Sequence, residues 1–330
     1  MEMMDPKSYI EAVVAGNRRM LAKTITLVES TRPEHRRLAQ QVIDGLLPYG
    51  GKAIRLGITG VPGVGKSTFI ESLGMMLIEK GHKVAVLAVD PSSQRSGGSI
   101  MADKTRMERL AVAPRAFIRP SPAGATLGGV ARMTRETMIV CEAAGFDVVI
   151  VETVGVGQSE TTVASMVDFF LVLMLAGAGD ELQGIKKGVL ELADAVAINK
   201  ADGDNVEKAR KAAKAYEMAL HLLNPATPTW SPPVLTCSAL TMDGIDRIWE
   251  TVCEHRRKLT ATGELEEKRR SQALQWMWSL VENGLKERFY NHPAVKARLE
   301  SVSSQVRKGL KAPTVAAQEL LFLLDNQQLV

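Results

Sequence analysis

The sequence predicts an α/β fold with a mostly parallel sheet that helices cover on both faces. From residue 53 to about 259, short β-branched apolar segments alternate with segments of helical periodicity. The apolar segments are hydrophobic almost throughout, which is typical of strands buried on both sides. A hydrophobic content of 45% and a mean hydropathy of −0.01 fit a globular protein with a substantial core.

Seven segments are predicted as strands: AIRLGIT (53–59), KVAVLAV (83–89), RAFIR (115–119), FDVVIVE (146–152), FFLVLML (169–175), AVAIN (195–199) and PVLTC (233–237). Helices are predicted between them, at 66–80, 130–144, 181–193, 204–223 and 243–258. The stretch 91–128 is rich in Ser, Gly and Pro and interrupts this alternation. A long irregular segment inside a compact domain usually has a function, so we expect a switch there.

Helical segments flank this core, which we place at residues 51–260. Residues 1–50 form a predicted helical extension of two or three helices, whose helical pattern is broken at Tyr49-Gly50-Gly51. Residues 261–330 form a predicted helical arm with a long helix over 264–290 and shorter helices from near Pro293 and Pro313. The arm has too little chain for a core of its own, so it packs on the main domain or on another subunit.

Composition and charge argue against several classes of protein. The net charge of +4 is small, and basic residues are interleaved with acidic ones, whereas nucleic-acid binders concentrate basic charge. The three cysteines are too scattered for a disulfide framework or a CxxC metal site. The N-terminus lacks a signal or transit pattern, and no apolar run reaches transmembrane length. We therefore expect a cytoplasmic protein without nucleic-acid or membrane partners.

The segment GVPGVGKST follows the first predicted strand and opens a helix, which is the context that a P-loop requires. Its glycines let backbone N–H groups converge on phosphates at a helix N-terminus. Lys66 supplies charge to the β- and γ-phosphates, and Ser67 supplies an oxygen to Mg²⁺. The residues predicted to bind the nucleotide here are Gly60, Val61, Pro62, Gly63, Val64, Gly65, Lys66, Ser67 and Thr68.

The NKAD segment ends the strand AVAIN and matches the guanine-reading NKxD pattern. The Asp202 carboxylate accepts from the N1–H and 2-amino groups of guanine, whereas adenine would leave it unpaired. Lys200 packs over the base, and Asn199 ties neighbouring loops together. The next loop to follow a strand is predicted to read the guanine O6 through a backbone N–H, and its residues are Ser238, Ala239 and Leu240. GTP and GDP are therefore the expected nucleotides.

Acidic residues near the ends of two strands are candidates for the magnesium site. Glu152 begins ETVG, where GTPases carry a DxxG motif, and the N–H of Gly155 senses the γ-phosphate. Val156 stands where a Ras-type GTPase has a water-positioning Gln, which implies slow hydrolysis. Asp90 ends a strand and Asp103 lies in the loop beyond it, so both are candidates for the magnesium shell. A helix-cap or turn role stays open for both.

With these motifs, the chain resembles the MeaB/ArgK family of P-loop GTPases. Further matching segments are VDPSS, RPSPAGATLGG, VETVGVGQSE and AGAGDELQGIKKG. The resemblance implies a homodimeric, magnesium-dependent GTPase that acts as a chaperone of adenosylcobalamin-dependent methylmalonyl-CoA mutase, gating cofactor loading and protecting or reactivating the mutase. It also implies that the catalytic and switch set is Lys66, Asp90, Asp103, Glu152 and Gly155. In the loop 177–188, Gln183 and Lys186 would relay the nucleotide state to the mutase.

Three other functions compete with this one. A transport-linked kinase, an older label of ArgK relatives, would need an acceptor-binding motif, and none is apparent. A nickel-type metallochaperone GTPase would need clustered Cys and His ligands, which this sequence lacks. A targeting GTPase of the signal recognition particle would need a Met-rich domain, but Met277 is the one methionine after residue 260.

Overall fold

The protein is described by a computed structural model covering residues 4–89, 107–120, 127–153, 159–177, 187–222 and 228–325. The chain divides into two compact units, Met1–Arg269 and Arg270–Val330. Residues 261–269, which open the predicted arm, therefore group with the unit that holds the sheet. The functional division at residues 50 and 260 stays a prediction.

The first unit contains a seven-stranded sheet in the order β3-β2-β4-β1-β5-β6-β7. All its neighbouring strands pair in parallel, so the predicted α/β fold is confirmed. The strands are β1 (Ile54–Gly60), β2 (Val84–Val89), β3 (Ala116–Arg119), β4 (Val148–Thr153), β5 (Phe169–Leu175), β6 (Ala195–Asn199) and β7 (Val234–Thr236). Nearly all of their bounds lie within one residue of those predicted from apolar runs.

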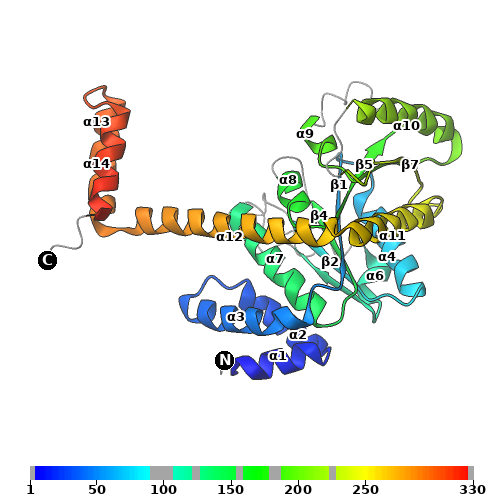
Figure 1. Cartoon of the computed structure of the whole chain (residues 1–330), viewed down its shortest axis with the longest axis horizontal. Coiled ribbons are helices and arrows are strands. Elements are labelled where there is room, and N and C mark those ends of the chain that lie inside the picture. The colour runs from blue at the N-terminus through cyan, green and yellow to red at the C-terminus, as the bar shows by residue number, and fades with distance from the viewer. Residues whose placement is uncertain are drawn as a thin grey trace. The chain divides into compact units, whose positions relative to one another are not determined.

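Helices pack on both faces of the sheet. On one face α7 (Leu127–Ala143) and α8 (Ser159–Ala164) contact each other and the central strands, and on the other α4 (Lys66–Glu79) contacts α11 (Ile245–Thr262) (Figure 1). Every residue of β2 and β4 is buried. Double coverage therefore explains why these strands are hydrophobic throughout.

Four further helical elements among the described residues belong to the first unit. They are α6 (Glu108–Val112), α9 (Lys187–Leu190), the 3-10 turn η3 (Gly203–Asn205) and α10 (Val206–His221). The helix predicted over 181–193 extends too far at its C-terminal end, because the N–H groups of Leu192 and Ala193 bond to carbonyls three residues back. These turns end the helix and lead into β6, which begins at Ala195.

The N-terminal extension forms three helices, α1 (Pro6–Val14), α2 (Arg18–Val28) and α3 (Pro33–Leu46), and the 3-10 turn η1 (Leu47–Tyr49). The side chains of Asp5 and Asn17 cap the first two helices by accepting from the N–H groups of Ser8 and Met20. All three helices contact one another and α7. Their apolar residues join the core of the first unit, so the extension is part of that unit's packing.

Single aspartates at the N-terminal edge of the sheet stand one residue ahead of β4, β5 and β6. Each accepts a backbone N–H from the chain at the start of a neighbouring strand, over 2.7 to 2.9 Å. The pairs are Asp147 with Lys83, Asp168 with Arg55, and Asp194 with Phe170. These carboxylates satisfy N–H groups at an edge where the ladder has just begun.

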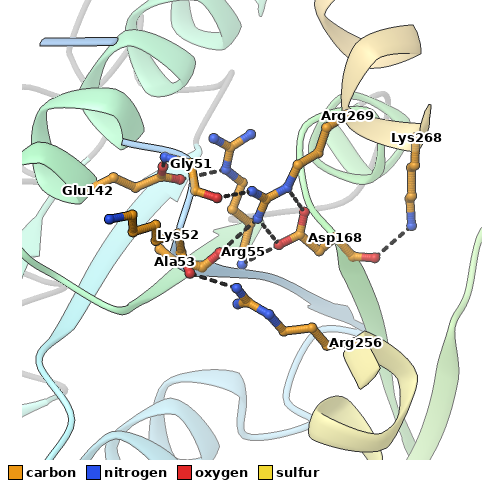
Figure 2. Close-up of polar contacts among 9 residues, drawn as sticks. All are labelled: Gly51, Lys52, Ala53, Arg55, Glu142, Asp168, Arg256, Lys268 and Arg269. Atoms are coloured by element: carbon orange, nitrogen blue, oxygen red, sulfur yellow. Dashed lines mark hydrogen bonds and ion pairs between the residues drawn. The ribbon is translucent and has the colours of Figure 1, made fainter. Parts of the chain in front are cut away.

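Residues in the first turns of α12 (Glu264–Asn291) bind two of these aspartates. Arg269 donates two hydrogen bonds of 2.7 Å to Asp168 and others to the carbonyls of Gly51 and Ala53 (Figure 2). Lys268 donates to the Asp168 carbonyl over 2.7 Å and lies 3.3 Å from Asp194. We call this contact set the arm-root clasp; it joins the start of α12 to the chain segments that enter β1, β5 and β6.

The second unit contains the rest of α12, followed by α13 (Pro293–Arg307) and α14 (Pro313–Asp325). The three predicted helices of this region are therefore present. Prolines open both shorter helices, where the fixed φ of proline suits the first turn and its missing N–H costs nothing. Within the described ranges, no helix combines the length and apolar character that crossing a membrane requires.

Candidate functional site

The P-loop lies between β1 and α4, at the edge of the sheet where the strands end. Gly60 passes so close to β5 that a Cβ atom there would stand 2.4 Å from the Leu173 carbonyl oxygen. Gly63 and Gly65 have φ values of 75° and 90°, which side chains rarely adopt. The three glycines of the motif are thus required by backbone geometry, and Gly65 caps α4 at its N-terminus.

Two polar side chains of the P-loop, those of Lys66 and Ser67, lie close to the ends of β1 and β4. The Lys66 ammonium donates to the Gly60 carbonyl over 2.9 Å. The Ser67 hydroxyl lies 3.4 Å from a carboxylate oxygen of Glu152, which is 4% exposed and belongs to β4. The structure thus brings together a P-loop hydroxyl and an acidic residue that lie 85 positions apart in the sequence.

This pair of oxygen donors fits magnesium, which prefers hard oxygen ligands and is commonly held by one or two carboxylates plus phosphates. Within the described ranges no group of three or more His, Cys, Asp and Glu side chains could hold a metal by itself. The Ser67–Glu152 pair therefore suits a cation that a nucleotide also ligates. Asp90 and Asp103, the other predicted magnesium ligands, lie outside the described residues.

A buried hydrogen bond that sequence reasoning missed joins β1 to β4 beside this pair. The hydroxyls of Thr59 and Thr153 are 2.7 Å apart, and both residues are at most 2% exposed. A threonine is an ordinary strand residue, so the pairing shows no signal in the sequence. It fixes the spacing of the two strand ends that lead into the P-loop and the ETVG segment.

Asn199 connects the P-loop to the loop after β7. Its amide nitrogen donates to the Val64 carbonyl over 2.8 Å, and its amide oxygen accepts the Ala239 N–H over 3.1 Å. The Cys237 thiol donates weakly to the same oxygen over 3.6 Å, and burial raises the pKa of that thiol to about 12, so it keeps its proton. Asn199 thus ties neighbouring loops together, as its motif predicts.

Asp202 and Lys200 follow Asn199 in irregular backbone. Asp202 accepts the Ser238 hydroxyl at 2.5 Å, which links the NKAD segment to the loop after β7. Lys200 has a φ of 59°, uncommon for a residue with a side chain. Its Cε would lie 4.0 Å from a Cβ placed on Gly65. The end of the Lys200 side chain therefore lies beside the P-loop.

The loop after β7 is mostly buried where it meets these residues. Ser238 and Ala239 are at most 6% exposed, whereas the Leu240 side chain is 80% exposed. The Ala239 carbonyl also accepts a hydrogen bond from Ser72 of α4 over 2.7 Å, a contact that the sequence did not suggest. Gly155, Gln183 and Lys186 lie outside the described residues, so their predicted roles stay predictions.

The chain matches a protein family and is similar to several individual proteins. The model of the family described as methylmalonyl Co-A mutase-associated GTPase MeaB matches residues 21–294. A probable GTPase of Mycobacterium bovis is 57% identical over 314 residues, covering 95% of this chain and 94% of that protein. GTPase ArgK of Escherichia coli is 48% identical, covering 94% of each.

Two further relatives extend the comparison. A mouse protein named methylmalonic aciduria type A homolog, mitochondrial, is 46% identical over 94% of this chain and 77% of its own length. The crystal structure of a protein named LAO/AO transport system kinase has a TM-score of 0.80 and 41% identity, covering 98% of this chain and all of that one. The chain thus belongs to the MeaB family, and it is a GTPase that binds guanine nucleotides.

Proposed function

We propose that this GTPase is a magnesium-dependent chaperone of adenosylcobalamin-dependent methylmalonyl-CoA mutase. In this role it gates loading of the cofactor and protects or reactivates the mutase. The family match over residues 21–294 carries the proposal, because that family is described by its association with the mutase. The mouse relative, named for methylmalonic aciduria, supports the same connection.

In the proposed reaction, the backbone N–H groups of residues 60–68, apart from Pro62, which has none, cradle the phosphates at the N-terminus of α4. The Lys66 ammonium, which donates to the Gly60 carbonyl in this structure, would turn to the β- and γ-phosphates. Ser67 and Glu152 would hold magnesium, directly or through water. Magnesium, when bound, neutralises charge that develops on the phosphates.

The base is read at the other end of the site in this proposal. Asp202 accepts from the guanine N1–H and 2-amino groups while the Ser238 hydroxyl orients its carboxylate. Lys200 covers the base plane, and the loop at residues 238–240 offers a backbone N–H to O6. Asn199 holds the two halves of the site in register, since it bonds to both the P-loop and this loop.

The switch parts of the proposal rest on sequence resemblance. Asp90 and Asp103 would complete the acidic set, and Gly155 would sense the γ-phosphate. Because Val156 replaces the water-positioning Gln, the free protein is expected to hydrolyse GTP slowly. Gln183 and Lys186 would then relay the nucleotide state to the mutase, and mutase binding would order the site.

The test is GTP turnover with and without methylmalonyl-CoA mutase. Ordering that stabilises the transition state by about 3 kcal/mol would raise the rate roughly a hundredfold. A chelator is expected to abolish turnover and added magnesium to restore it.

Lys186→Ala should reduce stimulation by the mutase but keep nucleotide affinity, and Lys187→Ala serves as the matched control. Absence of stimulation in the unaltered protein would contradict the mutase as partner.

We also propose that the arm forms a homodimer contact. Five apolar residues of α12 are at least 42% exposed and recur at helical spacing: Leu274, Met277, Trp278, Val281 and Leu285. This spacing places them on one face of the helix. A two-fold contact between copies is the commonest way to cover such a face.

Trp278→Glu is expected to shift the protein from dimer to monomer in light scattering, because it places a charge within the apolar face. Ser279→Glu is the matched control, since Ser279 is exposed and points away from the apolar residues. A dimer that persists in Trp278→Glu would place the contact elsewhere. GTP turnover of the isolated variant is expected to stay at the unaltered level, because the site residues all lie in the first unit.

A second candidate function is phosphoryl transfer to an acceptor, suggested by the name of the transport system kinase whose structure is 41% identical. The relatives from Mycobacterium bovis and Escherichia coli are instead named GTPases. Labelled GTP and ATP distinguish the two functions. A kinase transfers the label to a protein or small acceptor, whereas a GTPase releases it as phosphate from GTP alone.

A further inference from the structure

Ser72 lies within α4, six residues after the P-loop lysine. It contacts the loop after β7, whose residues 238–240 are assigned to base reading in the proposed function. Its hydroxyl donates a hydrogen bond of 2.7 Å to the Ala239 carbonyl, 167 positions later in the sequence. A serine in the middle of a helix commonly bonds back to the carbonyl four residues earlier. Here the single hydroxyl hydrogen is used instead to join the phosphate-binding helix to the loop after β7.

The contact fixes one of two neighbouring peptide groups in that loop. Asn199 accepts the Ala239 N–H over 3.1 Å, so it orients the peptide between residues 238 and 239. Ser72 holds the Ala239 carbonyl, which belongs to the next peptide group. Because a trans peptide is planar, fixing that carbonyl also fixes the Leu240 N–H in the opposite direction. The Ala239 N–H is engaged by Asn199, so the Leu240 N–H is the group of these two that is oriented towards a guanine O6, and Ser72 orients it from outside the loop.

The rest of the loop is held mainly by its own residues. The Ser238 N–H donates to the Asp243 carbonyl over 2.9 Å, and Thr241 donates to the Asp243 side chain over 2.6 Å. Gly244 closes the loop at a φ of 72°, where a Cβ would lie 2.4 Å from the Thr236 carbonyl oxygen. These contacts set the loop's shape, whereas the bond from Ser72 sets its position relative to α4 and the P-loop.

We propose that Ser72 is a positioning residue for base specificity: it holds the Ala239–Leu240 peptide so that the loop presents the Leu240 N–H to the guanine O6. This inference rests on the proposed base-reading role of the loop. It also ties base recognition to phosphate recognition, because α4 begins at Lys66. A displacement of that helix would move the O6-reading N–H with it.

Binding of three diphosphates to the full-length chain tests the proposal. GDP and IDP both carry O6, whereas 2-aminopurine riboside diphosphate lacks it. Ser72→Ala is expected to weaken GDP and IDP by roughly three- to tenfold, the range for one lost hydrogen bond. The affinity for the 2-aminopurine nucleotide is expected to change by less than about twofold, since it has no O6 to read. Ser72→Thr keeps the hydroxyl and is expected to restore GDP binding.

Glu71→Ala is the matched control in the same helix. It removes an acceptor that Glu71 offers to the Arg109 N–H over 2.7 Å, away from the base loop, so the ratio of GDP to 2-aminopurine affinity should stay unchanged. Equal losses for all three nucleotides in Ser72→Ala, or no loss for GDP, would overturn the role of Ser72. If Asp202→Asn also leaves GDP binding unchanged, the base-reading assignment itself fails. If that variant weakens GDP, only the Ser72 assignment falls.

Discussion

Asp202→Asn is expected to switch the base preference of the protein from GTP to xanthosine triphosphate. The carboxylate accepts two hydrogen bonds from guanine, whereas an amide accepts one and presents a donor to the 2-amino group. Losing one hydrogen bond to a charged group costs about 1.5–3 kcal/mol, so GTP binding should weaken by roughly tenfold to a hundredfold. Xanthine carries a 2-oxo group in place of the amine, which the amide can donate to.

The measurement is competition of GTP and xanthosine triphosphate for both proteins, with Asp204→Asn as the control. Asp204 is exposed and lies two residues later in η3, so the control makes the same chemical change just outside the proposed contact. We expect the control to keep its preference for GTP. Unchanged GTP affinity in Asp202→Asn would remove this residue from base reading.

Arg269→Ala is expected to lower the free energy of unfolding of the first unit by about 3–5 kcal/mol, the usual cost of breaking a buried ion pair. Its side chain is 18% exposed, and that of its partner Asp168 is 3% exposed. Loss of the guanidinium leaves the Asp168 carboxylate buried and removes donors from the Gly51 and Ala53 carbonyls (Figure 2). Urea unfolding at neutral pH measures the effect.

The loss should also depend on pH. Burial by itself raises the pKa of Asp168, but hydrogen bonds and charge from Arg269, with help from Arg55, hold it below its ordinary value. A lowered pKa stabilises the fold above the pKa of the unfolded state, about 3.9, and this contribution is lost as the pH falls through the folded value. In the variant, the hydrogen bonds and charge of Arg269 no longer oppose the effect of burial on the pKa of Asp168. This carboxyl therefore takes up its proton at a higher pH than in the unaltered protein. The difference between the two proteins should therefore be largest near pH 7 and shrink towards about pH 4.

Arg257→Ala is the control for this experiment. Arg257 is an exposed arginine of α11, and its replacement is expected to change the free energy of unfolding by no more than about 0.5 kcal/mol. Equal stability of Arg269→Ala and the unaltered protein would show that the arm-root clasp contributes nothing to the free energy of unfolding.

The arm-root clasp also implies that a truncation meant to remove the arm has to end after Arg269, because ending it near residue 260 would remove the contacts of Lys268 and Arg269 with the sheet.

One signal of this clasp is present in the sequence. An aspartate stands directly ahead of the apolar runs of β4, β5 and β6, in FDVV, VDFF and ADAV. A charged residue at the start of a buried strand needs partners, so the pattern could have predicted an acidic edge of the sheet. It could not have identified Arg269 as the partner of Asp168, because that choice depends on where α12 begins relative to the sheet.

The sequence by itself determined the strands, the P-loop and the NKAD segment. These features depend on local requirements: apolar runs for buried strands, glycines for the P-loop backbone, and a fixed spacing within each motif. Only the tertiary structure decided which side chains meet. Ser67 and Glu152 are 85 positions apart, Arg269 and Asp168 are 101, and Ser72 and Ala239 are 167. Each pair joins a residue of a helix to one in or close to a strand, so it depends on the order β3-β2-β4-β1-β5-β6-β7 and on where each helix packs. Strand order and helix packing are properties of the folded unit that no single segment encodes.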